Sequence, residues 1–357
     1  MNTFGKNIRI SLFGESHGEV VGITIDGFPA GLTIEHEKIK SALTRRRGQD
    51  SLSTTRREKD DYKIISGLFN NHTTGAPLTF IIPNYDIDST PYLQYGVIRP
   101  GHADLGLYQK FKGQHDYFGG GYSSGRLTAP LVILGTLCEE LLNRRGIIIA
   151  SRIRSLKNTN DVVVNASEIN ADLLLKLRKM EFPVLDRRAH DIMLNTIKKT
   201  RNDNDSVGGT IETFVYGYPG GIGEPFFNSV ESYLAHLMFS IPGIKGIEFG
   251  LGFNMTNFFG SEVNDQIVWK EEKIHLLSNN SGGICGGITN GNPLSFTVAV
   301  KPTSSIARPQ QSINYVTGEN ILLVTKGRHD PTFVHRALPV VEALTAFGLL
   351  DLLWEED

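Results

Sequence analysis

The sequence predicts an α+β protein, a single domain over residues 1–357 that is built from two similar layers of strand, turn and helix. Short apolar segments with strand-like alternation are interspersed with segments whose apolar residues recur at helical spacing. A strand, a Gly-aromatic-Pro-small-Gly turn and a helix follow one another at 22–46 and again at 209–239. This recurrence indicates a degenerate internal duplication, with a chance likeness between two Gly-Pro turns as the alternative.

In the first half of the chain, strand-like segments alternate with helices. Thr33 is predicted to cap a helix that ends at Gly48. The glycine-rich stretch 118–126 then leads into the most regular helix of the sequence, for which Thr128 is the predicted cap and Pro130 the first position. The other elements predicted here are strands at 8–12, 20–26, 63–68 and 78–82, loops at 49–61 and 84–97, and a helical turn at 105–111.

The second half continues in the same way. Asn170 is predicted to cap a helix through Leu177. The stretch 253–280 is polar, carries scattered aromatic residues without a clear period, and is predicted to be a mobile flap. The remaining predicted elements are strands at 147–153, 207–216 and 294–300, helices at 187–204, 229–239 and 340–353, and a glycine loop at 281–291.

The composition restricts the class of protein. An apolar content of 40% and a charged content of 21% are typical of a soluble globular protein with a sizeable core. The net charge of −2 does not favour nucleic-acid binding, and two cysteines cannot form a disulfide framework. No stretch reads as a secretory leader or a membrane span, so neither a nucleic acid nor a membrane is an expected partner and the cytoplasm is the expected location.

Two glycine-flanked histidines are the strongest candidates for acid–base chemistry. His17 lies in Phe-Gly-Glu-Ser-His-Gly at 13–18, directly after a predicted strand. His102 lies in Arg-Pro-Gly-His-Ala-Asp at 99–104, again beside glycine, arginine and aspartate. A histidine titrates near neutral pH, and flanking glycines let the backbone approach a ligand closely. A surface histidine in a turn is the alternative for either one alone.

The other polar residues in the predicted loops suit an anionic ligand. Arginines bind phosphate and carboxylate groups bidentately, and a Gly/Ser loop before a helix N-terminus binds anions. The sequence has no Cys/His spacing for zinc, no Gly-x-Ser-x-Gly elbow and no Gly-x-Gly-x-x-Gly after a strand, so no metal site is predicted. The residues by themselves therefore predict an enzyme acting on a phosphate-bearing ligand, as a lyase, a phosphatase or a phosphoryl transferase.

The order of the short motifs along the chain resembles that of the chorismate synthase family. Each motif alone has low specificity, but together they extend over essentially the whole chain. The motifs are Phe-Gly-Glu-Ser-His-Gly at 13–18, Arg-Pro-Gly-His-Ala-Asp at 99–104, Gly-Gly-Gly-x-Ser-Ser-x-Arg at 119–126, Gly-Gly-Ile-x-Gly-Gly-Ile at 282–288, Lys-Pro-Thr-Ser-Ser at 301–305 and Arg-His-Asp-Pro at 328–331.

The resemblance implies a reaction, a cofactor and an assembly. Members of the family eliminate phosphate and the C6 proton from 5-enolpyruvylshikimate 3-phosphate to give chorismate in the shikimate pathway. They require reduced FMN although the reaction has no net redox change. The resemblance further implies a β-α-β sandwich core and a homotetramer. Because the chain has no recognisable nicotinamide domain, NADPH is expected only as an external or weakly bound reductant.

The resemblance also implies roles for individual residues. His17 protonates the departing phosphate, His102 supplies a proton to the reduced flavin, and Ser16 with Asp330 relays a proton away from flavin N5. The implied substrate-binding residues are Arg45, Arg46, Arg126 and Arg336. The implied FMN-binding residues are Tyr122, Ser123, Ser124, Pro242, Gly243, Gly286, Lys301, Pro302, Thr303, Ser304, Ser305 and Arg328.

The sequence departs from the family pattern in two loops. In the third motif, Tyr122, Gly125 and Leu127 stand where the family has Arg, Ala and Glu, so one cation is lost and a phenol is gained. The loop after the three arginines is one residue shorter, and its second basic position falls near Leu52, which weakens the case for a nicotinamide contact there. Both histidines are intact, so an active enzyme is expected. A flavin-independent phosphatase or transferase and a non-catalytic flavin-binding protein are the alternatives.

Overall fold

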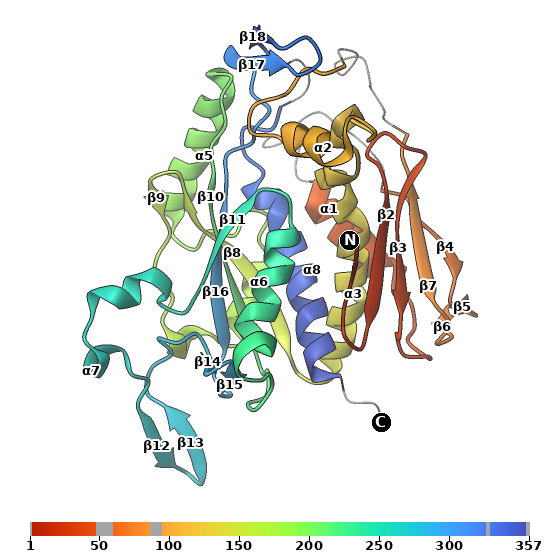
Figure 1. Cartoon of the computed structure of the whole chain (residues 1–357). Coiled ribbons are helices and arrows are strands. Elements are labelled where there is room, and N and C mark those ends of the chain that lie inside the picture. Colours follow the sequence, from red (N-terminus) through yellow and green to blue (C-terminus); the bar gives the residue numbers. More distant parts are fainter. Residues whose placement is uncertain (1, 48–59, 86–94, 326–328, 355–357) are drawn as a thin grey trace. The chain divides into compact units, whose positions relative to one another are not determined.

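The protein is represented by a computed structural model that describes residues 2–47, 60–85, 95–325 and 329–354 (Figure 1). Its contacts group the chain into two compact units. Unit 1 comprises 1–134, 194–208 and 302–336, and unit 2 comprises 135–193, 209–301 and 337–357. The prediction that the whole chain is one domain depends on how these units are joined and stays a prediction.

Unit 1 is built on a five-stranded antiparallel sheet in the order β1-β2-β3-β7-β4. Its strands are Thr3–Phe4, Arg9–Gly14, Val20–Asp26, Leu78–Pro83 and Lys63–Ser66 in that spatial order. Ile23, Ile25 and Phe80 are fully buried on β3 and β7, because their alternating positions place them on one face. The unit also contains helices α1 (His36–Arg47) and α2 (Asp104–Phe111) and the small hairpins β5–β6 (Leu68–Phe69, His72–Thr73) and β17–β18 (Gln310–Asn314, Glu319–Leu323).

Unit 2 contains a second five-stranded antiparallel sheet, in the order β11-β16-β10-β8-β9. Its strands are Ile244–Phe249, Leu294–Val300, Gly209–Tyr216, Ile148–Leu156 and Thr159–Asn160. Leu174 and Leu177 of α4 (Ala171–Lys179) pack with Ala150 and Phe214 of the sheet to form a buried core. The unit also contains α6 (Val230–Ser240), the single turn α7 (Gly260–Val263) and the hairpins β12–β13 (Ile267–Lys270, Lys273–Leu276) and β14–β15 (Ile284–Cys285, Ile288–Thr289).

Three helices have residues in both units: α3 (Thr128–Arg144), α5 (Arg187–Asn202) and α8 (Val334–Leu353). Within unit 2, α3 and α8 approach so closely that a Cβ on Gly135 would lie 2.2 Å from the Cα of Ala343. Among the described residues, no helix is both long and apolar enough to cross a membrane. The mixture of helices with antiparallel sheets confirms the predicted α+β class.

A buried threonine organises the turn after β3. The turn begins at Gly27, whose φ of 74° favours glycine. The hydroxyl of Thr73, on β6, donates to the carbonyl oxygen of Pro29 at 2.6 Å and accepts from the amide of Leu32 at 2.9 Å. The backbone carbonyl of the same threonine accepts from the amide of Gly31 at 2.8 Å. One side chain therefore ties the turn to the neighbouring hairpin.

The turn after β10 repeats this arrangement in unit 2. It begins at Gly217, where φ is 80°. The hydroxyl of Thr289, on β15, donates to the carbonyl oxygen of Pro219 at 2.7 Å and accepts from the amide of Ile222 at 3.0 Å. Its backbone carbonyl accepts from the amide of Gly221 at 2.8 Å. Each bond of the first turn therefore has a counterpart in the second.

Four strands of each sheet also correspond, because β2-β3-β7-β4 matches β8-β10-β16-β11 in both spatial order and chain order. The edge strands differ, since β1 precedes β2 whereas β9 follows β8. The strand after each threonine begins with the same pattern, Gly-x-Pro-Leu-x-Phe, at 75–80 and at 291–296. The predicted internal duplication is thus confirmed, and it extends beyond the turn and helix to the hairpin and strand that follow. The sequence of 281–291 is dominated by glycine and does not by itself reveal the hairpin β14–β15 within it.

The predicted helix cap at Thr33 is wrong. Thr33 forms a β-bridge with His72, and the amide of Ile34 donates to the carbonyl of Asn71 at 3.0 Å. Because this stretch is held in extended pairing, α1 begins only at His36. By contrast, the strand predicted at 20–26 and the cap at Asn170, whose Oδ1 accepts from the amide of Leu173 at 3.0 Å, are confirmed.

Two other regions differ from the predictions. The stretch predicted as a flap at 253–280 contains α7 and the β12–β13 hairpin, which turns at two residues with positive φ, Glu271 and Glu272. The last helix starts at Val334, before the predicted position 340, and has Pro339 inside it. The predicted loops at 49–61 and 84–97 lie largely outside the described residues.

We expect Thr73→Val and Thr289→Val each to lower the free energy of unfolding by about 1–3 kcal/mol, because valine leaves an amide and a carbonyl of the turn without their partner. Both threonines are 4% exposed. Urea denaturation of the two variants and of Thr256→Val, which removes an exposed hydroxyl, measures the effect. A destabilisation at only one of the two turns would contradict their physical equivalence.

Candidate active site

The predicted glycine loop of unit 1 is a sequence of tight turns that leads into α3. Gly119, Gly120 and Gly121 have φ values of 59°, 86° and 53°, a region that residues with a side chain rarely adopt. Ser124 then caps a short 3-10 turn at 125–127 by accepting from the amide of Arg126. The predicted capping role of Thr128 is therefore wrong, because this residue is the first of α3 and its hydroxyl donates back to the carbonyl of Gly125 at 2.6 Å.

His17 lies against this loop. A Cβ on Gly119 would lie 2.4 Å from Cδ2 and Nε2 of the His17 ring, so only glycine leaves room for the imidazole. The ring is stacked on Phe118, with 6.4 Å between centroids and an interplanar angle of 4°. The neighbouring residue, Ser16, is buried, and its amide donates to the carbonyl of Gly121 at 3.1 Å. The first and third motifs of the sequence are thus joined directly.

His102 is held between its own turn and the loop at 301–305. Its Nδ1 lies 3.0 Å from the carbonyl oxygen of Pro100, and its Nε2 lies 2.8 Å from the hydroxyl of Ser305. The hydroxyl of Ser304 donates to the carbonyl of Gly101 at 2.7 Å. Two further motifs, distant in sequence, are therefore joined at this histidine.

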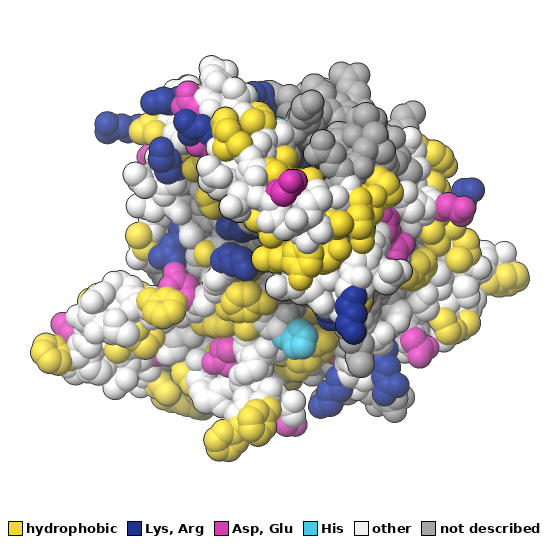
Figure 2. Space-filling model, turned by 45° about the horizontal axis from the view of Figure 1, so that its top comes forward, with side chains coloured by type: hydrophobic (Ala, Val, Ile, Leu, Met, Phe, Trp, Pro, Cys, Tyr) yellow, Lys and Arg dark blue, Asp and Glu magenta, His cyan; other side chains and the backbone are white. Residues whose placement is uncertain are grey.

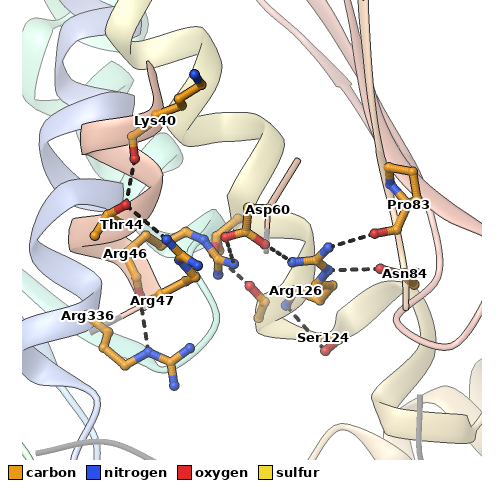
Figure 3. Close-up of polar contacts among 12 residues, drawn as sticks. Lys40, Thr44, Arg46, Arg47, Asp60, Pro83, Asn84, Ser124, Arg126 and Arg336 are labelled. Carbon is orange, nitrogen blue, oxygen red and sulfur yellow. Dashed lines mark hydrogen bonds and ion pairs between the residues drawn. The ribbon is translucent and has the colours of Figure 1, made fainter. Parts of the chain in front are cut away.

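A buried ion cluster connects α1 with the glycine loop (Figure 3). The carboxylate of Asp60 accepts from Nη2 of Arg46 at 3.1 Å and, through its other oxygen, from Nη1 of Arg126. Nη1 of Arg46 also donates to the hydroxyl of Thr128 at 3.3 Å. Arg46 and Arg126 are 6% and 5% exposed. The two arginines predicted to bind substrate thus share one carboxylate, that of Asp60, which no sequence motif singles out.

This cluster contains two positive side chains for one negative side chain, and this excess of positive charge affects the pKa values of its members. Burial alone would raise the pKa of Asp60, but the positive charges and hydrogen bonds of Arg46 and Arg126 outweigh burial and hold this pKa below its usual value. Burial lowers the pKa of Arg46 to about 10 despite the attraction of Asp60, and nearby Arg336 and Arg126 add to the decrease. Two guanidinium groups share one carboxylate here, so the cluster retains positive charge that suits an anionic ligand.

Asn84 joins the cluster to the His17 turn. Its Oδ1 accepts from Nε of Arg126 at 2.9 Å. Its Nδ2 donates to the carbonyls of Glu15 and Gly18 at 3.0 and 2.8 Å. The amide of this one side chain therefore fixes both the arginine and the loop that carries His17. A single asparagine at the end of a strand has no distinctive pattern, so the sequence does not reveal this role of Asn84.

Asp330 and Arg336 extend the cluster from the start of α8. Nη1 of Arg336 donates to Asp330 at 2.5 Å, and its Nε donates to the backbone carbonyl of Arg46 at 3.2 Å. Together with Asp60 and Asn84, these contacts form a continuous path from Asp330 to the His17 turn. Arg45, the other predicted substrate-binding arginine, is half-buried on α1.

The predicted cofactor residues of unit 1 lie mainly around the two histidines. The ring of Tyr122 contacts Phe111 edge-on, with 5.9 Å between centroids, and the hydroxyl of Ser123 donates to the carbonyl of Gly120 at 2.7 Å. The hydroxyl oxygen of Thr303 is buried and has no hydrogen-bond partner among the described residues. Pro302 is exposed, and Arg328 lies outside the described residues.

The predicted cofactor residues of unit 2 are Pro242, Gly243, Gly286 and Lys301. The amide of Lys301 donates to the carbonyl of Gly243 at 2.9 Å, which links two of them. Burial, followed by the charge of Lys245, lowers the pKa of the Lys301 ammonium group. Pro242 is exposed. Gly286 has a φ of 63° in the turn between β14 and β15, with open space where a Cβ would lie.

Comparison with known proteins now identifies the family. The family model for chorismate synthase matches residues 8–354. The chain belongs to the chorismate synthase family. A chorismate synthase of Thermococcus gammatolerans is 43% identical over 98% of this chain and 96% of its own length, and one of Archaeoglobus fulgidus is 39% identical over 99% and 97%. A crystal structure of a chorismate synthase superposes with a TM-score of 0.76 and 29% identity, covering 98% of this chain and 92% of that one.

Family membership establishes the class of chemistry. The chain is a carbon–oxygen lyase acting on phosphate, in the shikimate pathway of aromatic amino-acid biosynthesis. This selects the lyase among the three enzyme classes that the residues alone left open. In the described part of the chain, no group of three or more His, Cys, Asp or Glu side chains is arranged to hold a metal ion.

We expect Gly119→Ala to reduce chorismate formation by about 100-fold, because the new methyl group displaces His17 and a misplacement of about 1 Å can have this effect. Gly125→Ala is the matched control, since no atom lies within 4 Å of the place its Cβ would take and φ there is not positive. Steady-state rates and circular dichroism of both variants separate loss of activity from loss of fold. Equal activity of the two variants would contradict the close contact at His17.

We expect Asp60→Asn to lower the free energy of unfolding at pH 7 by about 3 kcal/mol, because it leaves two buried guanidinium groups without a counter-charge. Asp61→Asn, at the neighbouring exposed position, is the control. The pKa of Asp60 is depressed in the folded state, so its stabilisation is present above the unfolded-state pKa and disappears as the pH falls through the folded-state value. Urea denaturation should therefore show the two proteins, wild type and Asp60→Asn, converging below about pH 4.

Proposed function

We propose that this chain converts 5-enolpyruvylshikimate 3-phosphate into chorismate by eliminating phosphate and the C6 proton, with the ion cluster and the two histidines of unit 1 as its machinery. The observation that carries the proposal is the set of direct contacts between motif loops that are distant in sequence. Ser16 contacts Gly121, and His102 contacts Ser305. Asp330 reaches α1 through Arg336.

The cluster supports binding of a substrate that carries a phosphate and carboxylates. We assign this role to Arg45, Arg46, Arg126 and Arg336. Nε of Arg46 is buried without a hydrogen-bond partner among the described residues, which is costly unless a ligand completes it. Held in place by Asp60 and Asn84, Arg126 needs little reorganisation when charge develops on the departing phosphate.

The histidines and their neighbours supply proton transfers. We assign to His17 the protonation of the departing phosphate, because its ring lies beside the glycine loop that precedes the N-terminus of α3. We assign to His102 the supply of a proton, from a ring whose Nε2 lies 2.8 Å from the hydroxyl of Ser305. Ser16 and Asp330 are assigned to carry the C6 proton away, and the Asp330 carboxylate is held in place by Nη1 of Arg336.

The residues present suit FMN. The buried hydroxyl of Thr303 is without a partner among the described residues, as expected of a group that binds a ligand. Tyr122, Ser123 and Ser124 offer hydroxyls at the glycine loop, and Lys301 offers a cation. The remaining assigned residues are Pro242, Gly243, Gly286, Pro302, Ser304, Ser305 and Arg328. Reduced FMN, when bound, supplies electron density to the substrate with no net redox change.

We expect chorismate formation only under anaerobic conditions with photoreduced FMN, and a loss of about 10²–10⁴-fold in His17→Ala and His102→Ala. His275→Ala, an exposed histidine on β13, is the control. Absorbance of chorismate and released phosphate are measured together. NADPH with oxidised FMN should give no turnover, since we propose an external reductant.

Other outcomes of this assay identify the alternatives. Phosphate release in air without flavin would indicate a flavin-independent phosphatase or transferase. Release that stays at background in the wild type and both histidine variants, with FMN still bound, would indicate a non-catalytic flavin-binding protein. Robust turnover with NADPH and FMN in a purified anaerobic sample would show that the chain reduces its own cofactor.

We further propose a homotetramer in the cytoplasm. Large apolar side chains of unit 2 support the assembly, because burying them against further copies of the chain is favourable. Phe227 is 94% exposed, Phe253 81% and Trp269 73%. Figure 2 shows apolar side chains, in yellow, on one face of the molecule. Contiguous exposed apolar patches mark sites where proteins bind one another.

We expect light scattering after size-exclusion chromatography to give the mass of a tetramer for the wild type. Trp269→Lys should give smaller species, because a charge replaces an apolar contact in the hairpin β12–β13. Lys270→Ala, the next residue on the same strand, is the control. A monomeric wild type at micromolar concentration would contradict the proposed assembly.

A further inference from the structure

We propose that Ser305 determines where His102 carries its exchangeable proton, and that it is a positioning residue for proton transfer in addition to its place in the cofactor loop. The inference rests on the proposed function, in which His102 supplies a proton. It concerns atoms of this chain alone and can be tested without turnover.

The partners of the two ring nitrogens define the protonation of His102. The carbonyl oxygen of Pro100, 3.0 Å from Nδ1, can only accept a hydrogen bond, so Nδ1 carries a hydrogen. In the neutral ring Nε2 is then the acceptor, and the hydroxyl of Ser305 at 2.8 Å donates to it. The proton that the ring gains or loses is therefore the one on Nε2, opposite Ser305.

The hydroxyl suits both states of the ring. When His102 is protonated, Nε2–H donates to Oγ of Ser305, and the hydroxyl proton turns to another acceptor. When the ring gives up the Nε2 proton to the base that receives it in the proposed function, one N–H bond breaks and one bond to that base forms, so no oxidant or reductant is needed. The Ser305 hydroxyl then turns its own hydrogen back to Nε2.

An ion pair on the same turn fixes the position of His102 relative to Ser305. Nε and Nη2 of Arg99 donate to the carboxylate of Asp104 at 2.7 and 2.8 Å, which closes the turn that carries His102. Burial would raise the pKa of Asp104, but the hydrogen bonds and charge of Arg99, with a smaller effect of His102, keep it below its usual value. On its own turn, the His102 ring therefore lies near the ion pair of Arg99 with Asp104, whose charges cancel. The hydroxyl of Ser305 contacts the ring from the loop at 301–305.

Two other serines distinguish this role from simple anchoring of the loop. The hydroxyl of Ser304 donates to the carbonyl of Gly101 and joins the same two loops without touching the ring. The hydroxyl of Ser206 donates to the carbonyl of Thr303 at 2.6 Å and anchors the same loop from another side. Ser206 belongs to neither the catalytic nor the binding residues, so Ser206→Ala is the matched control.

The test compares Ser305→Ala, Ser305→Thr and Ser206→Ala as full-length proteins without added FMN. Histidine is labelled with ¹⁵N, and the signals of His102 are identified by their loss in His102→Gln. We expect Ser305→Ala to shift the Nε2 resonance and change its titration with pH. Ser305→Thr, which retains the hydroxyl, and Ser206→Ala should keep the wild-type spectrum.

In the anaerobic assay, Ser305→Ala should lower kcat by about 10–100-fold with KM for the substrate changed less than about twofold, and Ser305→Thr should recover most of kcat. Unchanged Nε2 signals in Ser305→Ala would overturn the proposal, as would a loss confined to FMN affinity measured by flavin fluorescence. If the wild type formed no chorismate, the proposed function would fail, while the ¹⁵N spectra would still decide the link between Ser305 and His102.

Discussion

The site of unit 1 depends on one carboxylate placed between two buried guanidinium groups. Asp60 accepts from Arg46 on α1 and from Arg126 in the turn before α3. Removing charges from water costs several kcal/mol per ion, and a shared carboxylate recovers only part of that cost. The pKa values show how these opposing effects balance. At Asp60 the two cations outweigh burial and lower the pKa, whereas at Arg46 burial outweighs the attraction of the shared carboxylate and also lowers the pKa. The cluster is therefore better explained by the position and positive charge that it maintains than by its contribution to stability.

This electrostatic constraint extends to the acid–base groups through short contacts. Asn84 links Arg126 to the turn that carries His17, and Arg336 links α1 to Asp330. Asn84 and Arg336 each make hydrogen bonds in two directions. A shift of one bonded partner therefore also moves the other partner. The fixed geometry limits the reorganisation needed during the reaction, which is the main advantage of a preorganised site over water.

The internal duplication separates glycines with a structural role from glycines that suit a ligand. Gly286 and Gly287 form the turn of the β14–β15 hairpin with φ values of 63° and 89°. Their counterparts in unit 1 are Asn70 and Asn71, at 47° and 62° in the β5–β6 hairpin. This turn needs left-handed backbone in both copies, so the hairpin by itself accounts for glycine at 286 and 287. The turns at 119–121 instead lie against His17, in contact with a predicted catalytic side chain.

The amino-acid sequence by itself determined the class of fold, the existence of a repeat and the motif-bearing loops, because these depend on local periodicity, turn chemistry and short ordered patterns. It also predicted His17, His102 and the arginines as candidate site residues. It did not indicate that Asp60 and Asn84 hold these groups, or that Thr33 belongs to an extended bridge. Only the tertiary structure decided those points. An isolated aspartate, asparagine or threonine acquires its role from partners far away in the sequence, and burial determines which of those partners it must satisfy.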